Sequence, residues 1–268
     1  MEEIQLQKKY IKARTDRSGA QVHDDLFAYA YCFKNNLTFT GSLGLDNFEN
    51  HFILCKIFNI PLPKKIYNND LGEKMCKDYR KYDADLFSKK FLNHIHSKVN
   101  YPIPFRNKTY NVVVHVRRGD INPKKKCKYA YRYLYNSYYT NIINMIKKYK
   151  STYKLNITIL SEKKSYESLD CFSEYNILLN KNLTECWEMM YKADILVISK
   201  SSFSYVPAIY NKNIVIYTLF WHKKLENWLD SSSSIFDKDL DHRMRMMRQQ
   251  NKLAKKVKRE KRDLKITK

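Results

Sequence analysis

The sequence predicts an α/β protein built on a parallel β-sheet, and three observations carry that prediction. Short apolar runs rich in β-branched residues recur between residues 111 and 217, as strands covered on both faces require. Segments with helical apolar spacing separate these runs. Turn residues and polar side chains follow them, at the edge where open α/β sheets bind ligands. The strand–helix rhythm is typical of a parallel sheet with Rossmann-like winding.

The chain of 268 residues is long enough for one large domain or two small ones. Two prolines in the segment 101–107 disfavour both helix and sheet, so this segment is the predicted linker. We therefore expect an N-terminal lobe over 1–105, a second lobe over 106–237 and a tail over 238–268.

The expected elements follow from apolar spacing and from the turn residues between them. Before the linker we expect strands at 10–13 and 37–40, and helices at 22–35, 50–58 and within 73–100. After it we expect strands at 112–114, 156–161, 176–179, 194–199 and 213–217, and helices at 130–149, at 184–192 and directly after 201–204.

A run of three valines forms the central expected strand, and polar residues follow it at once: His115, Arg117, Arg118, Gly119 and Asp120. A guanidinium is always charged and fits a phosphate through two parallel hydrogen bonds. Glycine allows a sharp turn or a close approach of the backbone to a ligand. The residues alone leave two readings open, a phosphate site and a structural ion pair with Asp120.

Two further strand ends carry polar residues. Glu162 follows the strand at 156–161, where it could bind a ribose or base, or cap the next element. Ser201, Ser202 and Phe203 follow the strand at 194–199. Hydroxyls and backbone N–H groups at the start of a helix hold phosphate well. Phe203 could pack on a nucleotide or in the core.

Two of these stretches resemble motifs of one family. His-Val-Arg-Arg-Gly-Asp at 115–120 is similar to the His-x-Arg-Arg-x-Asp signature of the GDP-fucose-dependent fucosyltransferases, which include the α1,2-, α1,6- and protein O-fucosyltransferases. The segment 193–204, an Ala-Asp pair followed by an apolar strand and Ser-Ser-Phe-Ser, resembles a later motif of that superfamily. The resemblance extends over 110–217 and is closest to the α1,2 members.

The resemblance implies a GT-B-like architecture with two Rossmann-like lobes, the C-terminal one binding GDP-β-L-fucose. Fucose would pass to a hydroxyl of a glycan acceptor with inversion and without a metal ion. Arg117 and Arg118 would hold the β-phosphate, Asp120 would orient them, and His115 would contact guanine or ribose. The other residues implied at the donor are Glu162, Glu185 or Glu188, Ser201, Ser202 and Phe203. The general base stays open among Asp24, Asp25, Asp120 and Glu162.

The formal net charge of +23 supports an alternative function. Residues 243–268 hold twelve Lys and Arg against two acids, in a tail that we expect to be disordered or a loosely docked helix. Such a surface attracts nucleic acid or anionic membrane. A third reading is a degenerate transferase that binds nucleotide without turnover, because Lys163 stands where the relatives carry a second acid.

Neither a metal site nor a cofactor other than the donor is expected. The six cysteines form no Cys-x-x-Cys pair and no histidine lies at zinc-finger spacing. The N-terminus is acidic and polar, unlike a signal peptide, and no apolar run approaches the ~20 residues of a membrane span. These features predict a cytoplasmic protein.

Overall fold

The computed structural model describes residues 18–36, 38–39, 49–61, 86–101, 109–124, 126–148 and 154–266. Its centre is a six-stranded sheet in which every pairing is parallel, as the sequence predicts. The strands are β1 (Thr109–Val116), β2 (Lys154–Ser161), β3 (Asn176–Leu179), β4 (Ile195–Val197), β5 (Ile214–Tyr217) and β6 (Leu229–Asp230).

The strand order is β3-β2-β1-β4-β5-β6, so the chain winds outward from β1 in one direction and then returns to continue on the other side. This is the doubly wound order, and the reversal between β1 and β4 is the point where such sheets bind ligands. Val112 pairs with both Ile157 of β2 and Ile195 of β4, which places β1 in the middle of the sheet.

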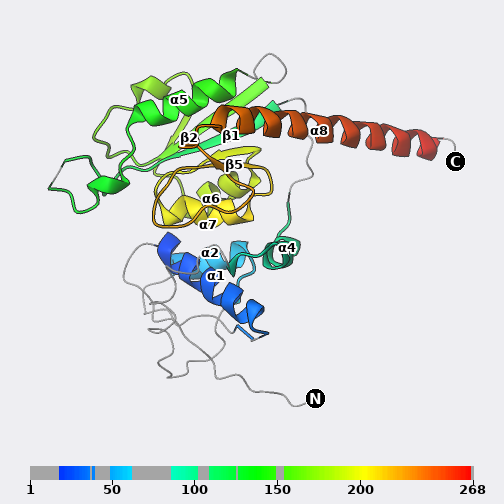
Figure 1. The fold of residues 1–268 in the computed structure, drawn as a ribbon, viewed down its shortest axis with the longest axis horizontal. Coiled ribbons are helices and arrows are strands. Elements are labelled where there is room, and N and C mark those ends of the chain that lie inside the picture. The colour runs from blue at the N-terminus through cyan, green and yellow to red at the C-terminus, as the bar shows by residue number, and fades with distance from the viewer. Residues whose placement is uncertain are drawn as a thin grey trace.

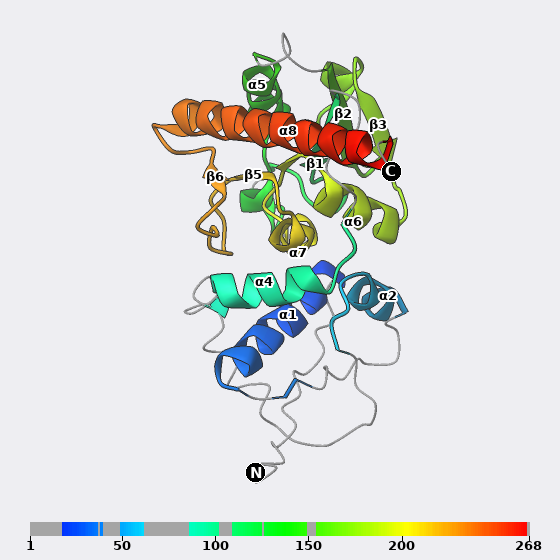
Figure 2. The ribbon, with the colours of Figure 1, turned by 90° about the vertical axis from the view of Figure 1, so that its right-hand side faces the viewer.

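Helices cover both faces of the sheet (Figures 1 and 2). On one face lie α5 (Asn136–Lys147) and α8 (Phe236–Ile266), and on the other α6 (Leu183–Lys192) and α7 (Ser202–Tyr210). Val112, Val114 and Val116 belong to the apolar layer on the α5 side, whereas Val113 belongs to the layer on the α7 side. The valine run is therefore apolar throughout because both faces of β1 are buried.

Three helices precede the sheet in the described part of the chain: α1 (Ser18–Lys34), α2 (Glu49–Ile57) and α4 (Lys89–Ser97). They pack beneath α6 and α7 in Figure 1 and share one apolar core with them. Within this core the rings of Phe58 and Tyr210 stack at 3.8 Å between centroids. The strand expected at 10–13 and the linker at 102–107 lie outside the described residues, and 38–39 carries no strand.

Two expectations about helices need correction. The helix expected at 130–149 is broken: a short 3-10 turn, η1 (Ala130–Arg132), comes first, and α5 begins only at Asn136. For the tail at 238–268 the expectation is disorder or a loosely docked helix; the helix is confirmed, because α8 runs to Ile266, and only the loose docking needs correction at its start. Leu240 and Met244 lie in the core beside the sheet, so the start of α8 is part of the fold.

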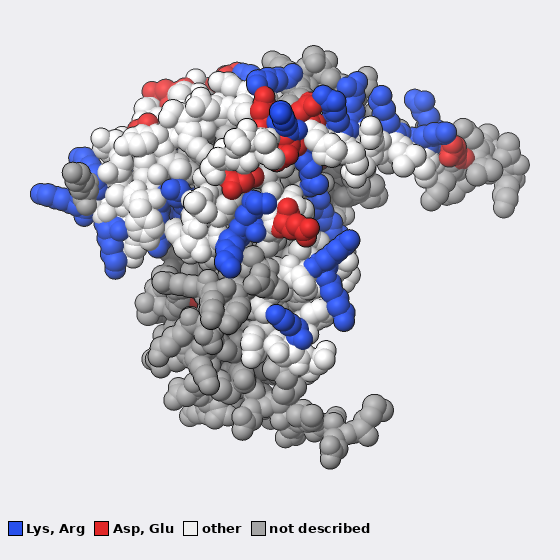
Figure 3. Space-filling view, viewed as in Figure 1, with Lys and Arg blue, Asp and Glu red and all other residues white. Residues whose placement is uncertain are grey.

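The distal half of α8 extends away from the body (Figure 1). In Figure 3, Lys and Arg side chains stand along this helix and also over other parts of the visible face, with acidic side chains between them. None of the helices in the described ranges is both long and apolar enough to cross a membrane.

Candidate functional site

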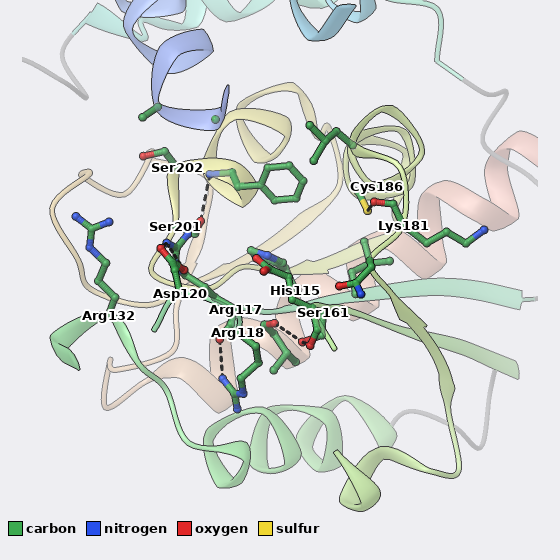
Figure 4. Close-up of a pocket in the computed structure, with 18 of the residues that line it drawn as sticks. His115, Arg117, Arg118, Asp120, Arg132, Ser161, Lys181, Cys186, Ser201 and Ser202 are labelled. Carbon is green, nitrogen blue, oxygen red and sulfur yellow. Dashed lines mark hydrogen bonds and ion pairs between the residues drawn. The ribbon is translucent and has the colours of Figure 1, made fainter. Parts of the chain in front are cut away.

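A cavity of about 530 Å³ lies beyond the carboxyl ends of β1 and β2, where the chain runs on from His115 and Ser161. The residues after β4, at the start of α7, form another wall, so the cavity lies at the reversal point of the sheet (Figure 4). Gly19 and Ala20, from the start of α1, line it from the opposite side. The cavity thus lies between the carboxyl edge of the sheet and the start of α1.

Arg117 links the two motif stretches at the centre of this cavity. One of its terminal nitrogens donates to Ser201 Oγ at 2.8 Å, and the other contacts both carboxylate oxygens of Asp120 at 2.9 and 3.1 Å. Asp120 thereby orients the guanidinium, as the sequence predicts for one of the two arginines. The side chain is 11% exposed, so its charge acts with little screening by water.

Arg118 takes a different position from the one expected. Its guanidinium points away from the cavity toward α5 in Figure 4 and is fully buried. It donates to the backbone oxygens of Arg117 and Leu134 at 2.8 and 3.1 Å and to Asn136 Oδ1 at 2.5 Å. It also lies 4.4 Å above the ring of Tyr133. With both terminal nitrogens engaged inside the fold, Arg118 is a structural cation, and of the two arginines only Arg117 is placed to contact a ligand in the cavity.

Gly119 forms the turn that separates these two arginines from Asp120. Its φ of +88° is a backbone conformation that side chains disfavour, and its N–H donates to the Lys164 oxygen at 2.8 Å. A Cβ at Gly119 would lie 1.9 Å from Glu162 Oε2, so the carboxylate rests directly over the glycine. Glu162 lines the cavity as expected, but no helix follows it for it to cap.

His115 lines the cavity as a neutral imidazole. It is 8% exposed, and its Nδ1 is 2.8 Å from Ser199 Oγ. Burial, reinforced by the charges of Arg117 and Arg118, lowers the pKa of His115 to about 3. The imidazole is therefore suited to hydrogen bonding with a neutral part of a ligand rather than to neutralising a phosphate.

The start of α7 provides an anion site beside Arg117. Ser201 is the N-cap, and its hydroxyl accepts from the Phe203 N–H at 3.3 Å. Because Ser201, Ser202 and Phe203 line the cavity, the positive end of the α7 dipole lies at its wall, which favours a negatively charged ligand. The ring of Phe203 lies 5.4 Å from that of His115, and Ser202 and Phe203 also line the cavity.

The two glutamates expected on α6 lie outside the cavity lining. Glu185 forms an ion pair with Lys181 at 3.2 Å, and Glu188 pairs with Lys192 at 2.6 Å, each on the helix surface. The structure brings Lys181 to the cavity instead. Which residues of α6 face the cavity cannot be predicted before the first residue of the helix is known, because a shift of one residue turns each side chain by about 100° around the helix axis.

Sequence reasoning missed an arginine between aromatic rings at the cavity wall. The guanidinium of Arg132 lies 4.2 Å from the ring of Tyr129 and 4.3 Å from that of Trp221, and all three residues line the cavity. The signal was present as a Tyr-rich stretch with one arginine, but the expected helix at 130–149 assigned it to a core stripe. A guanidinium stacked on half-buried aromatic rings suits the binding of a planar or ring-shaped ligand.

The candidate general bases differ in their access to the cavity. Asp24 and Asp25 are buried in α1 and are absent from the lining, whereas Asp120 and Glu162 belong to it. Asp120 is committed to Arg117. Sequence reasoning also missed His222, which is 3% exposed and whose Nε2 lies 2.8 Å from Ser202 Oγ.

The cavity as a whole is electropositive. Four lining residues are cationic and two are acidic, although the guanidinium of one cation, Arg118, points away from the cavity; the start of α7 adds the partial charge of its dipole. Within the described ranges, no three His, Cys, Asp or Glu side chains are placed to hold a metal ion. The four cationic residues are Arg117, Arg118, Arg132 and Lys181. A phosphate-bearing ligand matches this arrangement.

Comparisons with protein-family models, with curated proteins and with solved structures find no match to this chain. The fold and the site define an α/β protein with a doubly wound parallel sheet and an electropositive cavity at its reversal point.

Proposed function

We propose that the chain is an inverting fucosyltransferase that moves L-fucose from GDP-β-L-fucose to a hydroxyl of a glycan acceptor. The observation that carries the proposal is the contact between Arg117 and Ser201, which lie in the two stretches that resemble the fucosyltransferase motifs. These residues are 84 positions apart in the sequence and meet at 2.8 Å beside a helix N-terminus. An arginine fork and a helix start together form a site for the β-phosphate.

The proposed reaction depends on charge stabilisation. As the bond between the anomeric carbon and the phosphate oxygen breaks, negative charge grows on the leaving GDP. Arg117, oriented by Asp120, and the positive end of the α7 dipole would stabilise this charge where it develops. We propose that this charge replaces a divalent ion and that the reaction is metal-independent.

The other lining residues would hold the nucleoside and the sugar. The neutral His115 and the carboxylate of Glu162, which rests over Gly119, suit hydrogen bonds to ribose or guanine. The N-terminal helices close the cavity opposite the sheet, where a GT-B-like enzyme would receive its acceptor. The GT-B architecture and the lobes at 1–105 and 106–237 are part of this proposal.

A calorimetric titration tests the donor. We expect GDP and GDP-fucose to bind without added metal, and UDP-galactose to bind at least tenfold more weakly. GDP-mannose serves as the control for the sugar. Arg117→Ala removes about two charge-assisted hydrogen bonds of ~1.5–3 kcal/mol each, which predicts a loss of GDP affinity of at least about 100-fold.

Lys148→Ala is the matched control, because Lys148 is an exposed cation that pairs with Asp237 away from the cavity. It should leave the affinity for GDP unchanged. Equal binding of GDP by the wild type and Arg117→Ala would refute the phosphate site. Loss of fucose transfer in EDTA would refute metal independence.

A second candidate function is supported by α8. Its distal half extends from the body and lies in the segment with twelve Lys and Arg against two acids (Figure 1). We propose nucleic acid or another polyanion as the partner if the cavity binds no nucleotide. Binding should then weaken steeply with salt and should be lost when residues 248–268 are removed.

A further inference from the structure

Two buried histidines lie directly behind the cavity wall at the start of α7. His222 Nε2 is 2.8 Å from Ser202 Oγ, and Ser202 lines the cavity. The ring of His222 lies 4.0 Å from that of His23, which comes from α1 and is fully buried. A hydroxyl at the cavity surface is therefore connected to an imidazole that solvent does not reach.

The packing around His222 fixes the direction of its ring. Tyr205 stacks on it at 4.5 Å between centroids and 26° between planes, on α7, and Phe220 meets it edge-on at 5.4 Å. The Tyr217 hydroxyl donates to the His222 backbone oxygen at 2.7 Å. An imidazole held in this way keeps its Nε2 aimed at Ser202, as a proton acceptor beside a reactive hydroxyl requires.

The titratable groups around His222 come from each element packed against it. From α1 they are His23 and Asp24. A carboxylate oxygen of Asp24 lies 4.0 Å from the ring nitrogen Nδ1 of His23. Tyr205 comes from α7, Tyr217 from the end of β5 and Lys223 from the loop that follows it. The backbone oxygen of Lys223 accepts the Tyr205 hydroxyl.

The two adjacent serines are directed to different partners. Ser201 is bonded to Arg117 on the sheet side, whereas Ser202 is bonded to His222 and lies nearer to α1 (Figure 4). The start of α1 reaches this point, since a Cβ at Gly19 would lie 2.6 Å from the Cα of Phe203. In an inverting displacement the attacking hydroxyl approaches opposite to the leaving phosphate, so the base must lie away from Arg117.

The other candidate bases fit this requirement less well. Asp120 is held by Arg117, on the phosphate side. Glu162 rests over Gly119 at the end of β2, on the side expected for the nucleoside. Asp24 is buried and lies outside the lining. Of the groups that the described residues bring to the cavity, the Ser202–His222 pair stands on the α1 side and ends in a nitrogen base.

We propose that Ser202 and His222 form a proton-transfer dyad that deprotonates the attacking acceptor hydroxyl, an assignment that rests on the proposed transferase function. The acceptor oxygen bonds to the anomeric carbon while the bond from that carbon to the phosphate oxygen breaks, leaving its electron pair on GDP. The acceptor proton passes to Ser202 Oγ as the Ser202 proton passes to His222 Nε2. Ser202 is the catalytic residue, and His222 acts through it.

The activation of Ser202 can be measured without any donor or acceptor, by its reaction with a small fluorophosphonate. In that reaction Ser202 Oγ bonds to phosphorus, fluoride leaves and the proton moves to His222. We expect one adduct, located at Ser202 by peptide mass spectrometry, at a rate that rises with pH. Ser202→Ala should carry no adduct, and the exposed Ser173→Ala should react like the wild type.

His222→Gln separates proton transfer from structure, because its amide can still donate a hydrogen bond to Ser202 but cannot take up a proton. We expect a loss in labelling rate of about 100-fold or more and a flat pH profile, with an unchanged melting temperature. The exposed His242→Gln is the control. Absence of an adduct at Ser202, or labelling of His222→Gln within threefold of the wild-type rate, would overturn the dyad.

Donor binding and hydrolysis test the proposed transferase function separately from the dyad. GDP and GDP-fucose binding, measured by calorimetry, do not require proton transfer and should be intact in His222→Gln. Failure of donor binding together with His222-dependent labelling would remove the proposed donor and keep the dyad. Donor binding and hydrolysis of GDP-fucose with the same pH profile in His222→Gln and the wild type would keep the transferase and remove the dyad.

Discussion

Replacing Arg118 by methionine should destabilise the protein strongly while lowering its affinity for GDP far less than Arg117→Ala does. The guanidinium is fully buried and satisfies three acceptors, the oxygens of Arg117, Leu134 and Asn136. It also lies 3.5 Å from the Glu167 carboxylate. Methionine fills a similar volume but donates no hydrogen bond, so the substitution isolates the polar contacts from the packing.

The magnitude follows from these contacts. Each buried acceptor left without a donor costs ~1–3 kcal/mol, and removing one partner of a buried charged pair costs ~3–5 kcal/mol. Glu167 is 27% exposed and keeps the Tyr133 hydroxyl and the Asn136 N–H, so it rehydrates in part. We therefore leave the charged pair out and take the low end of the three acceptor costs, about 3 kcal/mol in all, which is a large share of the ~5–15 kcal/mol that holds a domain folded.

Urea unfolding at pH 7, followed by fluorescence and by circular dichroism, measures this loss. Arg132→Met is the matched control, because Arg132 lies in an aromatic stack at the cavity wall and should cost only ~1 kcal/mol or less. A loss below 1 kcal/mol in Arg118→Met would refute its role as a structural cation. A loss of GDP affinity as large as that of Arg117→Ala would return Arg118 to the phosphate site.

Two further predictions concern His115 and Gly19. The pKa of His115 is lowered to about 3 in the fold, so below its ordinary value of ~6.5 the unfolded chain binds a proton that the native state does not. Stability should therefore fall as the pH drops from about 6.5 toward 3, and His115→Gln should flatten that slope in urea unfolding; equal slopes would contradict the neutral imidazole. Gly19→Ala should destabilise by ~1–3 kcal/mol, because its Cβ would meet the Phe203 backbone at 2.6 Å. Helix propensity alone predicts a gain of about 1 kcal/mol, so a rise in melting temperature would refute the close approach of α1 and α7.

The sheet could be predicted because burial on both faces leaves a direct record in the sequence. The valine run expected as a strand lies within β1 (Thr109–Val116), and the strand end expected at 161 is that of the structure. The position of the cavity also followed, since polar residues after consecutive parallel strands meet at one edge. These inferences need only the period of the pattern and the direction of the strands.

The conformation of the segments between elements could not be predicted. The Tyr-rich stretch at 130–149 has helical spacing, yet the chain extends at Tyr133, with ψ of 133°, before α5 begins at Asn136. The burial of Arg118 accounts for this break, because the Leu134 oxygen and Asn136 Oδ1 are its acceptors. Local spacing cannot report a contact with a residue 18 positions earlier.

The composition of the tail was also an incomplete guide to its structure. The high charge of 238–268 predicts disorder or a loose helix, but charge averaged over a segment hides the few apolar residues at its start. Leu240 and Met244 lie one helical turn apart, and they pack beside β1 in one apolar layer with Phe236. A narrow stripe of apolar residues is enough to dock a helix where a neighbouring apolar surface buries that stripe.

The site contains two pairs of identical neighbours, and in each pair the two members do different work. Arg117 faces the cavity while Arg118 anchors the start of α5, and Ser201 caps α7 beside Arg117 while Ser202 turns to His222. Neighbours in a non-helical segment point in different directions, so only one of each pair can reach a given ligand group. Arg118 nevertheless acts on the site, because it donates to the Arg117 backbone oxygen and so fixes the residue from which the cavity-facing guanidinium projects. A doubled residue in such a motif therefore indicates one ligand contact and one support, and the neighbouring elements determine which is which.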